Sequence, residues 1–142
     1  MRDDTFTGDP PVKKFCKCTT CIPKSRETVG ISRSVKRHAW GLEVLCKDPA
    51  VYSPVVTSVL LPEGVDADAL RKLILERFNL SLGTGLGKLK GRVFRIGHLG
   101  DCNALSLMAA ISGCEMGLQI FGVQLKSSGV VAAQNVLQSS VA

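Results

Sequence analysis

Apolar positions recur along this chain with two different periods, and each period predicts a different kind of element. A β-branched run over residues 55–61 ends at a Pro-Glu-Gly turn and predicts a strand. Apolar residues then recur at helical spacing over residues 67–78, where Asp66 is the expected N-cap. A longer helical pattern covers residues 104–121, after an Asp or Asn cap. The chain therefore mixes strands with amphipathic helices.

Shorter patterns fill the intervals between these elements. Residues 34–45 predict a short helix followed by an extended stretch, and residues 130–137 predict a last short helix. Residues 80–82 are expected to form a short strand, residues 83–91 a loop, and residues 92–97 a further strand. These runs are too short for a doubly wound parallel sheet. We therefore expect an α/β sandwich, a small mixed or antiparallel sheet with helices on one face.

The strand predicted at residues 92–97 contains a single arginine among apolar residues. Strand alternation puts two small residues and this cation on one face and larger groups on the other, that is, Val93, Arg95 and Gly97 against Phe94, Ile96 and His98. A guanidinium keeps its charge and matches a carboxylate bidentately, so Arg95 indicates either a buried ion pair or a carboxylate-binding site. The glycine-rich loop before the strand favours a ligand, although the residues alone leave both readings open.

That loop contains Gly83, Gly85 and Gly87 and superficially suggests a phosphate-binding motif. It does not have the P-loop spacing, because Leu82 stands where glycine is required and Leu89 where Ser or Thr is required. It also differs from the dinucleotide fingerprint, because a strand rather than a helix follows it. We expect a loop whose glycines let the backbone pass close to another surface.

Composition narrows the class of protein. A length of 142 residues suits one domain with a conventional core. The hydrophobic fraction of 45% is high, yet no run approaches the roughly 20 apolar residues of a membrane span. The N-terminus has no secretory signal, so we expect a soluble, cytoplasmic protein whose six cysteines are thiols.

The first 33 residues differ from the rest of the chain. They show no structural period, and residues 1–40 carry +5 of the net charge of +6, so we expect a basic, disordered leader. A solvated tail is favoured over nucleic-acid binding, because few aromatic residues are present for stacking. Three cysteines of this leader are weak candidates for a zinc site, with Cys46 or His38 as the fourth ligand. They are weak because the spacing does not contain two Cys-x-x-Cys pairs. The three are Cys16, Cys18 and Cys21.

Several blocks of the remaining sequence match a known family. They are Trp40-Gly-Leu-Glu-Val-Leu-Cys46, Tyr52-Ser-Pro-Val-Val-Thr57, Leu61-Pro-Glu-Gly64, the block from Leu82 through Asp101, and Glu115-Met-Gly-Leu118. In these blocks the chain resembles the C-terminal small domain of class V, fold type I pyridoxal-phosphate aminotransferases, most closely the serine–glyoxylate and alanine–glyoxylate enzymes. The resemblance implies that residues 34–142 form that small domain, that Arg95 binds the substrate carboxylate, and that the glycine loop lines the active-site mouth.

The same resemblance implies what must come from elsewhere. In the family, a preceding large domain holds the Schiff-base lysine and the other pyridoxal phosphate ligands. No counterpart is found in this sequence, so we expect no catalytic residue, no bound cofactor and no transamination by the chain alone. We expect self-association or docking to an aminotransferase large domain, with small amino or oxo acids as the parent enzyme's substrates. The alternative is a non-catalytic module for small carboxylates or protein docking, with a basic, metal-binding tail.

Overall fold

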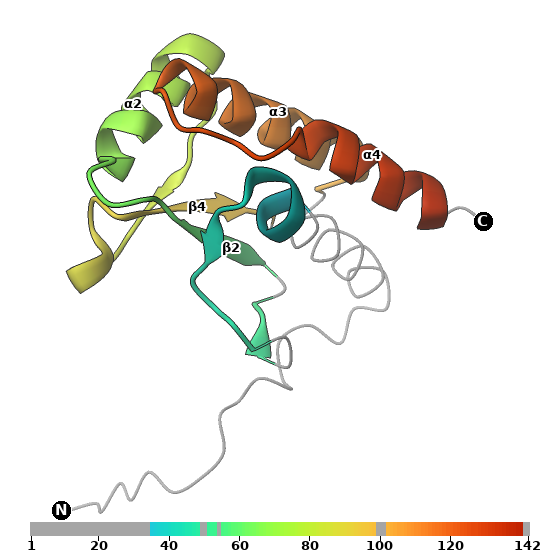
Figure 1. The fold of residues 1–142 in the computed structure, drawn as a ribbon, viewed down its shortest axis with the longest axis horizontal. Helices are drawn as coiled ribbons and strands as arrows, with labels where there is room; N and C mark the ends of the chain where they lie inside the picture. Colours follow the sequence, from blue (N-terminus) through green and yellow to red (C-terminus); the bar gives the residue numbers. More distant parts are fainter. Residues whose placement is uncertain (1–34, 49–50, 54, 99–101, 141–142) are drawn as a thin grey trace, which may run out of the picture.

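Helices cover one face of a small antiparallel sheet in the computed structural model (Figure 1). The described residues are 35–48, 51–53, 55–98 and 102–140. Within them, the hydrophobic core lies between the sheet and the helical layer and draws side chains from both. This arrangement confirms the expected α/β sandwich.

The sheet has four strands in the order β1-β2-β4-β3, and each neighbouring pair is antiparallel. The strands are β1 (Glu43–Val44), β2 (Val56–Leu60), β3 (Gly83–Thr84) and β4 (Val93–Gly97). The central strands, β2 and β4, pair along their whole length, from Val56 with Gly97 to Leu60 with Val93. The β-branched run and the Arg95 strand therefore lie side by side.

One strand was predicted in the wrong place. The expectation put a short strand at residues 80–82 and a loop from Gly83, whereas β3 consists of Gly83 and Thr84. These two residues pair with Arg95 and Phe94 of β4. Tertiary pairing with β4 thus overrides the low strand propensity of glycine.

The helices are the π-helix η1 (Val35–Trp40), α2 (Ala67–Phe78), the 3-10 turn η3 (Gly87–Leu89), α3 (Ala104–Ile120) and α4 (Gly129–Ser140). The start of α2 agrees with prediction, because the Asp66 carboxylate accepts a hydrogen bond from the Asp68 backbone N–H at 2.8 Å. Asn103 caps α3 in the same way, accepting from the Ser106 N–H at 2.8 Å. Local capping signals therefore define where both long helices begin.

The helices of the layer contact one another in the order α2, α3, α4, η1, so the first described helix of the chain packs beside the last. Helix α2 contacts β4 and α3, and α4 lies against both α3 and η1 (Figure 1). A methyl group added at Gly117 of α3 would lie 2.3 Å from Ile74 of α2, so the glycine permits a close helix crossing. Phe94 and Ile96 of β4 are fully buried beneath these helices. Burying each such side chain contributes roughly 1.5–3 kcal/mol.

A buried carboxylate joins the two ends of the described fold. Glu115 of α3 is only 7% exposed, and one of its oxygens accepts hydrogen bonds from the Trp40 indole N–H at 2.7 Å and the Gly129 N–H at 2.5 Å. The Val130 N–H approaches the same oxygen at 3.3 Å, and the Ser128 hydroxyl donates to the other at 2.8 Å. The carboxylate thus sits at the positive N-terminus of α4 and ties that helix to η1. No sequence pattern had predicted this contact.

Not all apolar side chains enter the core. Leu105 of α3 is 78% exposed and Leu86, in the loop before η3, is 66% exposed. Further half-exposed apolar residues lie on the helical layer, among them Ile120 of α3 and Val131 of α4. Among the described helices, none has the length and apolarity needed to cross a membrane.

Candidate carboxylate-binding site

Arg95 lies at the centre of β4, on the sheet face opposite the described helices, which we call the open face. Its chain neighbours Phe94 and Ile96 point into the core, so strand alternation directs Arg95 to the opposite face. The residues directly across from it are Ser58 on β2 and Gly83 on β3. Because directly paired residues share a face, these two small residues flank the arginine.

The guanidinium of Arg95 is half-buried and lacks an internal counter-ion among the described residues. In that part of the chain, its Nε is the one buried side-chain nitrogen or oxygen without a hydrogen-bond partner. Leaving such a donor unpaired costs about 1–3 kcal/mol. Of the two possibilities that the sequence left open, the described residues supply no partner for an internal ion pair, and a ligand-binding site is the other possibility.

The electrostatics of the open face depend on this one residue. Arg95 is the only charged residue in β2 and β4, whose ten residues are otherwise apolar or neutral. A single cation on a partly desolvated face attracts anions more strongly than one in bulk water. On this face, the planar guanidinium of Arg95 presents paired N–H donors, and such a pair can bind one carboxylate.

The three glycines of the loop have different local roles. Gly83 lies beside Arg95, as its strand pairing requires. A methyl group at Gly85 would lie 2.1 Å from the Leu89 carbonyl oxygen, so this glycine lets the loop fold back on itself. Gly87 opens η3 with a φ of +55°, which few other residues adopt. The expectation of close backbone approach thus applies to Gly83 and Gly85 in particular.

A polar cluster fastens β3 to α2 and so holds the loop. The Asp68 carboxylate accepts hydrogen bonds from Arg71 at 2.8 Å and from the Thr84 hydroxyl at 2.9 Å. Arg71 also donates through Nε to the Leu82 carbonyl at 2.8 Å. The Thr84 bond, followed by the Arg71 bond, lowers the pKa of the Asp68 carboxyl. The i, i+3 spacing of Asp68 and Arg71 was a visible signal for half of this cluster.

The other candidate groups do not assemble a second site within the described residues. Cys16, Cys18 and Cys21 lie outside them, and no three His, Cys, Asp or Glu side chains inside them are placed to hold a metal. The Cys46 thiol donates to the Asp48 carbonyl at 3.6 Å. His98 is buried, with its Nε2 2.9 Å from the Thr57 hydroxyl.

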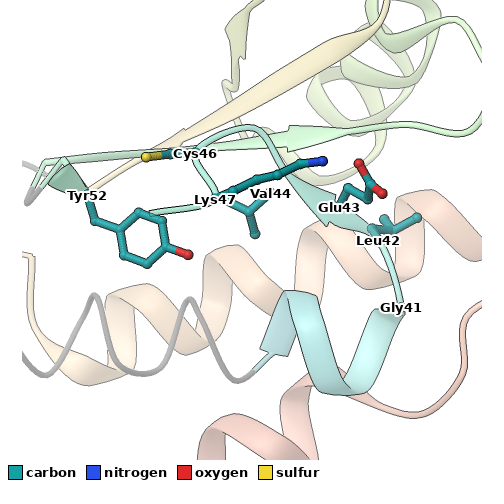
Figure 2. Close-up of a pocket in the computed structure, with 7 residues that line it drawn as sticks. All are labelled: Gly41, Leu42, Glu43, Val44, Cys46, Lys47 and Tyr52. Carbon is teal, nitrogen blue, oxygen red and sulfur yellow. The ribbon is translucent and has the colours of Figure 1, made fainter. Parts of the chain in front are cut away.

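A pocket of about 330 Å³ lies apart from Arg95, along β1 and the segment that follows it (Figure 2). Its wall includes the exposed charges of Glu43 and Lys47, and the Tyr52 ring stands at its far side. Neither Arg95 nor any glycine of the 83–87 loop lines it. The pocket and the arginine are therefore separate features.

Comparison with other proteins relates this geometry to a group of enzymes, although no family model matches the sequence. Over 103 residues, 72% of the chain, it is 50% identical to a serine–glyoxylate aminotransferase of Methylorubrum extorquens. It is 41% identical over 105 residues to a serine–glyoxylate aminotransferase of Arabidopsis thaliana. In each case the match covers 26% of the relative. The chain thus spans about a quarter of the length of these relatives.

Solved structures agree with the sequence matches. A pyridoxamine–pyruvate aminotransferase of Mesorhizobium loti superposes with a TM-score of 0.76 at 28% identity, over 83% of this chain and 30% of that one. The ureidoglycine–glyoxylate aminotransferase of Bacillus subtilis gives a TM-score of 0.75 at 25% identity, over 82% and 30%. The fold described above is therefore that of one domain of these larger proteins.

Proposed function

We propose that this chain, which corresponds to the C-terminal domain of a class V aminotransferase of the serine–glyoxylate type, uses Arg95 to bind the carboxylate of a small amino or oxo acid. The observation that carries the proposal is the half-buried guanidinium, which has no counter-ion among the described residues. A partly buried arginine without an internal anionic partner gains a favourable interaction when it binds an external anion. The relatives' names add the substrate class, because glyoxylate is a small oxo acid with one carboxylate.

The open face can orient such a substrate without reacting with it. Bidentate hydrogen bonds from a guanidinium fix both the position and the plane of a carboxylate. The flanking residues Ser58 and Gly83 are small, which leaves space above the sheet for a short acid. Holding the acid end of the molecule would direct its carbonyl or amino carbon toward a second surface.

In the related enzymes that second surface would carry pyridoxal phosphate, which supplies the electron sink for amino-group transfer. The described face around Arg95 does not fit this cofactor, because β2, β3 and β4 contain no lysine to attach it and one cation only. We therefore propose that a large aminotransferase domain holds the cofactor and closes over Arg95.

The test is a titration of the full chain with glyoxylate, followed by calorimetry and by amide NMR spectra. We expect saturable binding that Arg95→Ala weakens about tenfold or more, because a charge-assisted hydrogen bond contributes about 1.5–3 kcal/mol. Methyl glyoxylate, which lacks the carboxylate charge, should not compete.

The matched control is Arg92→Ala, which removes an exposed arginine just before β4 and should leave binding unchanged. Equal loss in both variants would show general charge attraction and would remove Arg95 from its proposed role. Binding that survives Arg95→Ala would do the same.

A further inference from the structure

We propose that Gly83 is a positioning residue for Arg95. Because glycine has no side chain, position 83 leaves the space that the guanidinium needs to adopt its binding orientation. The inference rests on the proposed function, in which Arg95 binds a carboxylate. It assigns to one glycine of the loop a role that differs from those of its neighbours. The relevant contacts all lie between two directly paired residues of β3 and β4.

The geometry at this pair is tight. A methyl group on Gly83 would lie 3.1 Å from the Arg95 Cβ and 3.3 Å from its Nε. Both separations are shorter than ordinary contact between these atoms, which begins near 3.5 Å. The Cβ is fixed by the backbone, whereas the Nε is carried on a flexible stem. A side chain at position 83 would therefore press on both the strand and the guanidinium, and of the two contacted atoms only the Nε can move aside without moving β4.

The same contact explains why the Arg95 Nε is buried. The Arg95 side chain turns back across its strand partner, so its Nε lies against Gly83 and out of reach of solvent. The terminal nitrogens are not among the buried unpartnered atoms of the described residues. They are the part of the fork that stays available to a ligand. We infer that the carboxylate binds end-on, through these two nitrogens, and that Gly83 fixes the direction in which they point.

Neighbouring glycines provide contrasts within the same structure. A methyl group at Gly85 would strike the Leu89 backbone rather than Arg95, so this glycine acts on the path of the loop. Gly97 lies on the open face of β4, two residues from Arg95, and a methyl group there would meet nothing within 4 Å. Gly97→Ala is therefore a matched control, since it adds the same methyl to the same face without touching the arginine.

The experiment compares Gly83→Ala, Gly97→Ala and Arg95→Ala in the full chain by glyoxylate titration. The second readout is the ¹⁵Nε–¹Hε NMR signal of Arg95, assigned by its disappearance in Arg95→Lys. We expect Gly83→Ala to weaken binding about tenfold, to shift this signal and to speed its exchange with water, because the enclosed N–H is released. Gly97→Ala should leave affinity and signal unchanged.

The outcomes separate this inference from the proposed function. Wild-type affinity in Gly83→Ala, or an unmoved Nε signal, would overturn the positioning role while Arg95 could still be the binding residue. A shifted signal in a protein that binds no glyoxylate even as wild type would support the positioning role and reject the proposed function.

Folding supplies the remaining control. If Gly83→Ala does not fold, the double variant Gly83→Ala/Arg95→Ala is examined by circular dichroism. Recovery of the fold in the double variant would support the inference, because the methyl then acts through the arginine side chain. A double variant that is equally unfolded would contradict it, because the methyl would then act on the backbone.

Discussion

Two partly or fully buried charges in this domain are treated in opposite ways. Glu115, beneath α4, accepts hydrogen bonds from four protein donors and so satisfies both of its oxygens. Arg95, on the open face of the sheet, keeps a buried Nε with no partner in the described structure. Buried polar groups are nearly always satisfied, so an exception calls for an explanation. The contrast fits a structural role for Glu115 and the proposed ligand-binding role of Arg95.

The most severe way to probe this contrast is Glu115→Ala. The change leaves the Trp40 indole and the first N–H groups of α4 without their acceptor. We expect the free energy of unfolding to fall by about 3 kcal/mol or more, because several buried donors lose their partner together. Urea denaturation followed by tryptophan fluorescence measures this directly, since Trp40 is the only tryptophan.

Glu115→Gln is the appropriate control for that measurement. Its amide oxygen can still accept from Trp40 and Gly129, and the Ser128 hydroxyl can reverse its role and accept from the amide nitrogen. We therefore expect a loss of only about 1 kcal/mol. If Glu115→Ala were as stable as wild type, the four hydrogen bonds would not hold α4 in place, and the proposed division between the two charges would fail.

Arg95→Met should act in the other direction and with a smaller magnitude. Methionine keeps the apolar stem of the arginine and removes the unpartnered nitrogen. We expect the free energy of unfolding to rise by about 1 kcal/mol while glyoxylate binding disappears, because a buried unsatisfied donor no longer has to be desolvated. The same urea experiment and the titration with glyoxylate provide the two readouts.

Arg92→Met serves as the comparison for this variant. Arg92 is exposed, so its replacement should change stability by no more than about 0.5 kcal/mol. Clear destabilisation by Arg95→Met alone would mean that the guanidinium contributes to the fold, as Glu115 does, and the reading of Arg95 as a group kept for a ligand would be wrong.

Arg95 and Glu115 also show how much of the structure could be predicted from the sequence. The bounds of α2 agree with prediction, because its Asp66 cap and its apolar spacing are local signals. Alternation along β4 likewise placed Arg95 opposite Phe94 and Ile96, as their burial now shows. Residue type and position were therefore enough to single out Arg95 as a candidate, and its binding role remains a prediction.

The partners of these residues were beyond local interpretation. Trp40 and Glu115 are 75 positions apart, and no periodic pattern connects them. The position of β3 was missed for a related reason, because Gly83 and Thr84 are strand residues only through their pairing with β4. The tight crossing at Gly117 also depends on a neighbouring helix. Propensity and periodicity describe single elements, whereas these features arise where two elements meet.

The smallest expected effect concerns a third kind of charge, the accessible but paired carboxylate of Asp68. Hydrogen bonds from Thr84 and then Arg71 lower its pKa in the folded protein. Its contribution to stability is therefore present above the unfolded pKa and is lost as pH falls through the folded pKa. We expect Asp68→Asn to be less stable than wild type near neutral pH, and the difference to shrink in acid; urea midpoints across a pH series measure it.

The control for this acid dependence is Glu76→Gln, also on α2. The Glu76 side chain is 63% exposed, and its Oε1 lies 3.9 Å from the Lys72 Nζ, which makes a long and weak ion pair. Removing its charge should therefore change the stability by an amount that hardly depends on pH. A pH-independent difference in stability for Asp68→Asn would show that its bonds to Thr84 and Arg71 do not depend on the charge.

Because Thr84 follows Gly83 in β3, loss of the Asp68 bonds should also loosen the strand against which Arg95 rests. Weaker glyoxylate binding by Asp68→Asn at neutral pH would connect the paired carboxylate to the unpaired guanidinium, and unchanged binding would show that β4 alone holds Arg95.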